Sequence, residues 1–237
     1  MDKIFLKSST PSKRDNSVMF VGIEKMKTIS KYLLEGGVNL KKTCLKLGYV
    51  PIKKQIPEAI ESLAYCGKNN FLNDDLYGDF DEAYLAEEVL NMLLKANNYL
   101  KKNYPNLEFL IYDAARPTRI QKIMWDFVKD TELRDFVADP EDGSVHNFGS
   151  AVDLSLIDKN GNSLDMGTGF DYFGELAEPI AEEKMVKENK LNMSQINNRK
   201  ILRDSMESSG FKVRYNEWWH FDAFPLEIAK NKFQRLL

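Results

Sequence analysis

The sequence contains few of the residues on which several classes of protein depend. Only two of its 237 residues are cysteines, Cys44 and Cys66, and only two are histidines. Neither cysteine belongs to a CxxC or Cys/His cluster, and two cysteines cannot form the disulfide framework of a domain this size. Two reduced, packed thiols are the simpler interpretation, with a single disulfide or a reactive thiol as the alternative.

Long apolar runs and basic clusters are also lacking. No apolar stretch approaches the roughly 20 residues of a membrane span. Residues 1–17 are polar and lack the apolar core of a signal peptide, which favours the cytoplasm unless an export segment was removed from the chain. The formal net charge is −3, and basic residues alternate with acids, so we expect no nucleic-acid partner.

What is present is the composition of a globular protein, with 43% hydrophobic and 29% charged residues. Apolar periodicity divides the chain in two. Residues 1–50 are predicted to form a helical N-terminal appendage of unknown role, with helices over 22–35 and 39–47. Residues 51–237 are predicted to form the main domain.

Helical and strand patterns are both found in the main domain. After a Gly/Asn-rich loop at 66–79, apolar stripes predict helices at 81–102, 119–129 and 195–209. Short apolar or alternating runs predict strands at 107–115, 150–158, 211–215 and 218–222. Asn160-Gly161 predicts a hairpin turn after the second of these strands. This order favours an α+β fold with a central antiparallel sheet flanked by helices.

Three side chains have the chemistry of a metal site. His146 lies in a glycine-containing loop and His220 among aromatic residues, so neither is on an apolar helical stripe. Asp153 falls between apolar residues of a predicted strand, where an ionised carboxylate without a partner costs several kcal/mol. Three nitrogen and oxygen ligands suit catalytic zinc, and the same set suits other divalent metals. The alternative is two ordinary loop histidines and a capping aspartate.

Glu217 precedes His220 by three residues and is the candidate base. Zinc lowers the pKa of bound water to about 7, and a nearby carboxylate can take the proton. In a regular strand, however, Glu217 shares a side with Trp219 and not with His220. The role of base therefore requires a local bend.

Several separated motifs carry a family resemblance. The pattern SxHxxGxAxD over residues 144–153 is followed by ExWH over 217–220. Further segments occur in a familiar order: NNFLNDDLYG (69–78), YDAARP (112–117), MGTGFDYF (166–173) and NRKILRDSMESSGFKVRYNEWWHF (198–221). From about Ile56 onward the chain resembles the zinc D-alanyl-D-alanine dipeptidases of peptidoglycan metabolism, which implies a D,D-peptidase/hedgehog-like fold.

The resemblance implies a role for each matching residue. His146, Asp153 and His220 match the ligands of one zinc ion, and Glu217 matches the catalytic base. Arg116 matches an arginine that stabilises the negative charge developing on the substrate carbonyl oxygen. The alternative for Arg116 is a surface ion pair near a helix start.

The same resemblance implies a substrate pocket. Asp171 matches a carboxylate that binds the free amino group of the dipeptide, and Tyr65 and Ser144 match residues that shape the same pocket. Asp171 is otherwise the N-cap of a helix. The sequence departs from the family pattern around His146, where the loop is more acidic and Phe148 replaces a small or polar residue.

The expected function is zinc-dependent hydrolysis of the small molecule D-Ala-D-Ala to two D-alanines. One alternative is a D,D-carboxypeptidase that trims peptidoglycan stem peptides, which requires an open groove beyond Asp171 and an exported protein. A non-catalytic zinc-binding module is a further alternative. Glu217 and Arg116 argue against that module, because metal binding alone needs neither.

Overall fold

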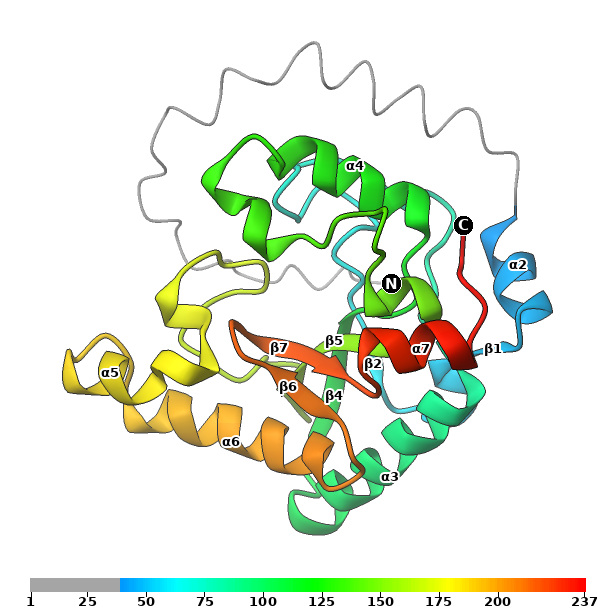
Figure 1. The fold of residues 1–237 in the computed structure, drawn as a ribbon. Coiled ribbons are helices and arrows are strands. Elements are labelled where there is room, and N and C mark those ends of the chain that lie inside the picture. The colour runs from blue at the N-terminus through cyan, green and yellow to red at the C-terminus, as the bar shows by residue number, and fades with distance from the viewer. Residues whose placement is uncertain (1–38) are drawn as a thin grey trace. The chain divides into compact units, whose positions relative to one another are not determined.

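Two sheets organise residues 39–237, the part of the chain that the computed structural model describes (Figure 1). The larger sheet has the strand order β2-β4-β5-β7-β6, and the smaller pairs β1 with β3. The strands are β1 Tyr49–Pro51, β2 Ile60–Glu61, β3 Tyr84–Ala86, β4 Leu107–Asp113, β5 Ala151–Asp158, β6 Lys212–Arg214 and β7 Glu217–Asp222. The expected antiparallel sheet is present, but the short edge strand β2 runs parallel to β4, so the sheet is mixed.

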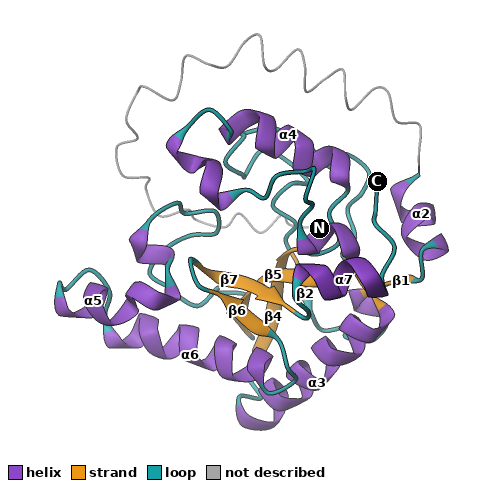
Figure 2. Cartoon of the chain, in the orientation of Figure 1, coloured by secondary structure: helices purple, strands orange, loops and turns teal. Residues whose placement is uncertain are grey.

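Helices surround the larger sheet (Figure 2). The α-helices are α2 Leu40–Lys46, α3 Glu87–Asn103, α4 Thr118–Val128, α5 Glu182–Lys187, α6 Met193–Glu207 and α7 Leu226–Lys232. Short 3₁₀ helices cover Ile52–Lys54, Glu132–Phe136, Val145–Phe148, Glu175–Ala177 and Pro179–Ala181. Helices α3 and α6 pack against each other and the strands, and Figure 1 shows α4 on the other side of the sheet. The α+β prediction is confirmed.

The alternation of strand β5 separates the core from the site. Successive side chains of a strand point to opposite faces of the sheet. Val152 and Leu154 are fully buried apolar residues on one face, whereas Asp153 between them points to the other. One strand therefore supplies both a core layer and a buried carboxylate.

Helix α3 shows where local periodicity misled the prediction. Its apolar stripe is buried as expected, with Val89 and Leu93 fully covered. The helix begins at Glu87 and not at residue 81, because Tyr84–Ala86 pairs antiparallel with Tyr49–Pro51. A pairing partner so distant in sequence leaves no trace in local periodicity.

Strand β1 follows α2 directly, and α2 matches the predicted helix at 39–47. The predicted helix at 22–35 lies outside the described residues, and the domain boundary at residue 50 stays a prediction. Cys44 and Cys66 are free thiols whose pKa burial raises to about 12, consistent with the packed-thiol interpretation. Within residues 39–237, the helices are too short or too polar to cross a membrane.

Candidate metal centre and active site

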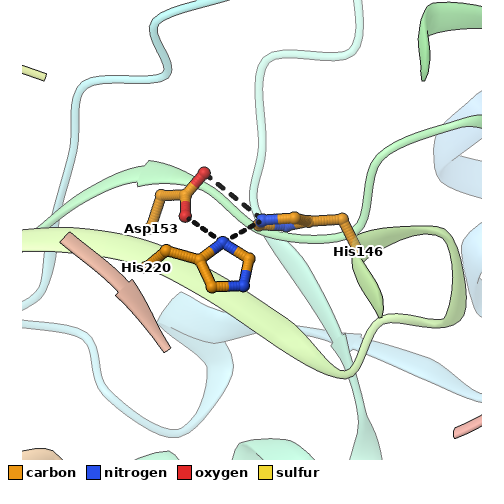
Figure 3. Close-up of side chains that lie close together, drawn as sticks. All are labelled: His146, Asp153 and His220. Carbon is orange, nitrogen blue, oxygen red and sulfur yellow. Dashed lines mark hydrogen bonds and ion pairs between the residues drawn. The ribbon is translucent and has the colours of Figure 1, made fainter. Parts of the chain in front are cut away.

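Strand register places the site residues in one row across the sheet. Asp153 on β5 is the pairing partner of His220 on β7 and of Asp113 on β4. The register of β4 shifts beside Asp113 through a bulge, a feature common next to active sites. His146 joins this row from the 3₁₀ helix that leads into β5. Figure 3 shows the side chains of His146, Asp153 and His220 pointing toward one another.

The three side chains are spaced as zinc ligands require. Nε2 of His146 lies 3.2 Å from Nδ1 of His220 and 3.3 Å from a carboxylate oxygen of Asp153. Nδ1 of His220 lies 3.0 Å from the other oxygen of Asp153. Tetrahedral zinc bonds of about 2.0–2.1 Å separate neighbouring ligand atoms by about 3.3 Å. All three residues are at least 97% buried, and the donor set fits a divalent metal.

The remaining ring nitrogens of both histidines are already bonded. Nδ1 of His146 lies 2.6 Å from the carbonyl oxygen of Ala114, to which it donates. Nε2 of His220 lies 2.9 Å from Oδ1 of Asp222. These bonds direct the facing nitrogens, His146 Nε2 and His220 Nδ1, at the centre of the site. Such partners hold metal-binding histidines in the required orientation.

Glu217 reaches the side of the sheet on which His220 lies. Its Oε2 is 3.7 Å from Nδ1 of His220, and the residue is only 8% exposed. The register of the β6–β7 pair shifts between Val213 and Arg214, which is the irregularity that the simple strand pattern lacked. Burial raises the pKa of Glu217, although the charges of His220 and Arg214 oppose that rise.

Arg116 is buried at the site and does not form the alternative surface ion pair. Asp113 accepts a hydrogen bond from its Nε at 2.8 Å and forms an ion pair with its Nη2 at 2.7 Å, and Gln121 accepts from Nη1 at 3.0 Å. The hydroxyl of Tyr77 donates to the other oxygen of Asp113 at 2.6 Å. Nη2 also lies 3.5 Å from Asp153, so the guanidinium is held beside the candidate metal ligands.

Asp171 lies in the same pocket, in a left-handed backbone conformation with φ of 56°. The helix that follows begins at Glu175 and has Gly174 as its N-cap, so the alternative of an N-cap role for Asp171 is wrong. The hydroxyl of Tyr65 donates to its carboxylate at 3.1 Å. Burial and the nearby charge of Asp153 raise the pKa of Asp171 well above its ordinary value. A neighbouring cation would therefore favour its ionised form.

Ser144 and Phe148 delimit the loop that carries His146. Ser144 lines the pocket and caps the 3₁₀ helix, accepting from the backbone N–H of His146 at 3.4 Å. Phe148 lies outside the pocket lining and packs with Val145 and Ala229 against α7. The departure at Phe148 therefore affects the packing of the loop and not the wall of the pocket.

Sequence reasoning missed the residues that support these groups. Asp113 lies within the YDAARP motif and Asp222 within EWWHFD, so both were near recognised residues. Gln121 lies on α4, which was predicted as a helix, but its contact with the site was not predicted. Arg214 also lines the pocket, from the end of β6. Each lies two to five positions from the recognised residue that it contacts, so proximity to a motif was the signal available in the sequence.

Comparison with known proteins relates the chain to a family of peptidases. A model of the D-ala-D-ala dipeptidase family matches residues 45–234. The chain is 30% identical over 181 residues to D-alanyl-D-alanine dipeptidase of Escherichia coli (strain K12), covering 72% of this chain and 84% of that protein. It is 28% identical over 167 residues to a Synechocystis protein of the same name, covering 58% and 68%. A shorter match of 79 residues, 37% identical, joins it to the Enterococcus faecium protein of that name, covering 33% and 36%.

Proposed function

Because the chain belongs to the D-Ala-D-Ala dipeptidase family of peptidases, we propose that it hydrolyses free D-Ala-D-Ala to two D-alanines with the help of zinc. The observation that carries the proposal is the convergence of two imidazole nitrogens and one carboxylate beside Glu217. A zinc ion held by His146, Asp153 and His220 would polarise the scissile carbonyl and lower the pKa of water.

Glu217 acts as the general base in this proposal. Its carboxylate takes a proton from the attacking water and returns it to the amine nitrogen that leaves, so that the peptide bond breaks and two amino acids result. Burial supports this role, because it raises the pKa of Glu217 and so makes the carboxylate a better proton acceptor. Its place 3.7 Å from His220 keeps it next to the metal ligands.

Arg116 stabilises the negative charge on the carbonyl oxygen. A donor that is already oriented contributes more than one that must reorganise during the reaction. Asp113 and Gln121 together hold three of the donor nitrogens of Arg116 in place. The buried guanidinium is therefore fixed beside Asp153 before substrate arrives.

Asp171 and Tyr65 select a free amino group. An ammonium ion entering the pocket favours ionised Asp171, and the Tyr65 hydroxyl supports that carboxylate through its hydrogen bond. An N-acylated peptide lacks the ammonium and would leave a buried carboxyl group without its partner. This difference favours the dipeptide over a longer stem peptide.

The testing experiment compares D-alanine release from free D-Ala-D-Ala and from N-acetyl-D-Ala-D-Ala by the zinc-loaded protein. We expect the free dipeptide to be cleaved and the acetylated one to be a poor substrate. The Glu217→Gln variant is the control, and it should keep its zinc while losing turnover. Preference for the acetylated peptide would instead assign a carboxypeptidase, and zinc binding without turnover of either would assign a binding module.

A further inference from the structure

The charges that line the pocket leave one end of the proposed substrate unaccounted for. A free dipeptide carries an ammonium and a carboxylate at neutral pH. The lining includes three carboxylates, those of Asp153, Asp171 and Glu217, which would repel the substrate carboxylate. The lining also includes two arginines, Arg116 and Arg214. Among the described residues, no other arginine lines this pocket. Arg116 is already bonded to Asp113 and Gln121.

Arg214 is placed differently. It is the strand partner of Glu217, and its Nε lies 3.9 Å from Oε2 of Glu217, which is too long for a hydrogen bond. That Nε is buried and has no hydrogen-bond partner among residues 39–237. The side chain as a whole is 31% exposed and lines the pocket, so a ligand bound there can reach it. A buried donor that lacks a partner is expected to gain one when a ligand binds.

We propose that Arg214 binds the C-terminal carboxylate of the dipeptide and so determines specificity for a substrate with a free C-terminus. The inference rests on the proposed dipeptidase function. A guanidinium matches a carboxylate in charge and in its paired donors. With Asp171 at the ammonium, both ends of the substrate are then read by an opposite charge. A longer chain at either end loses one of these contacts.

A purely structural role for Arg214 predicts a different behaviour. If Arg214 serves only to pair with Glu217, its removal changes the basicity of Glu217 and affects every substrate alike. If it binds the substrate carboxylate, its removal affects substrates that carry that group far more than substrates that lack it. Substrates that differ at the C-terminus alone therefore separate the two roles.

The experiment measures kcat and KM for D-Ala-D-Ala and for its C-terminal amide, D-Ala-D-Ala-NH₂. Both contain the same scissile bond, and the amide yields D-alanine and D-alaninamide. For Arg214→Ala we expect kcat/KM for the free acid to fall about 10- to 100-fold, mostly through KM, because a hydrogen bond to a charged group is lost. The kcat/KM for the amide should change less than about threefold, within the range of near-neutral substitutions.

Arg119→Ala is the matched control, because its Nε is also buried without a hydrogen-bond partner but Arg119 lies outside the pocket lining. It should leave the ratio between the two substrates unchanged. Arg214→Gln keeps most of the side-chain length without the charge, and it should repeat the selective loss if Arg214→Ala fails to fold. Equal losses on acid and amide, or no loss, would overturn the role of Arg214 while leaving the dipeptidase intact. Failure of the wild-type protein to cleave either substrate would overturn the dipeptidase proposal itself.

Discussion

Asp222 allows a quantitative test of the proposed zinc site. Its Oδ1 lies 2.9 Å from Nε2 of His220, and the opposite nitrogen, Nδ1, lies 3.0 Å from Asp153. The hydrogen bond keeps the proton on Nε2 and prevents the ring from turning. Without it, the ring must be oriented by the binding of the metal itself. Asp222→Ala should therefore weaken zinc binding.

The size of the effect follows from the position of Asp222. Loss of a partner that orients a metal-binding histidine costs about 10- to 100-fold in metal affinity, or about 1.4–2.7 kcal/mol. Asp222 is at the end of β7 with its side chain 27% exposed, so its removal should leave the fold intact. Asp222→Asn should cost less than Asp222→Ala, because the amide oxygen still accepts the hydrogen bond although it lacks the charge.

The assay is competition for zinc between the protein and a chromophoric chelator at fixed pH. Asp204→Ala provides the control for net charge, because Asp204 pairs with Lys200 on the exposed side of α6. We expect wild type and Asp204→Ala to bind zinc equally, with Asp222→Asn weaker and Asp222→Ala weakest. An unchanged zinc Kd for Asp222→Ala would refute the reasoning, since the ring would then be held by packing alone.

Three further predictions concern protonation, specificity and stability. Burial lowers the pKa of His220, but neighbouring carboxylates outweigh it and raise that pKa to about 10, so zinc must displace a proton at neutral pH. Calorimetry in buffers of different ionisation enthalpy should detect this proton, and zinc affinity should increase with pH until about 10. Asp171→Ala should raise KM for free D-Ala-D-Ala but not for its N-acetylated analogue, and equal changes would contradict the ammonium contact. Leu154→Ala, at a fully buried position of β5, should lower the free energy of unfolding by about 2–5 kcal/mol in urea titrations, and a loss below about 1 kcal/mol would contradict its place in the core.

The parts of the fold that could be predicted are those whose pattern is local. The apolar periods that predicted β5 and α4 place both within a residue of their observed bounds. Helices α5 and α7, with six and seven residues, were not predicted. The β1–β3 pair was missed because it depends on pairing between residues about 35 apart in the chain, a separation that no local pattern records.

The site residues differ in the kind of information that was needed to predict them. His146 and His220 are the two histidines of the sequence, and Asp153 is an acid in an apolar strand, so chemistry alone drew attention to them. Regular strand alternation argued against Glu217, which reaches the site beside an irregular strand register. Its role as the base was predicted from the family resemblance. Arg214 shares with Arg119 a buried Nε that has no hydrogen-bond partner among residues 39–237, and it differs from Arg119 by lining the pocket, which is a property of three-dimensional structure.

Two motifs that are separate in sequence, YDAARP (112–117) and SxHxxGxAxD (144–153), are joined by hydrogen bonds in the structure. The backbone N–H of Arg116 donates to the carbonyl oxygen of His146 at 3.1 Å, and the side chain of Asn147 donates to the carbonyl oxygen of Arg116 at 2.8 Å. The ring of His146 is bonded in turn to the carbonyl oxygen of Ala114 at 2.6 Å. Backbone atoms, and not side-chain packing alone, therefore set the position of Arg116 relative to the candidate metal ligand His146. An active site that stabilises charge on a metal-polarised carbonyl requires that distance to be fixed before substrate binds.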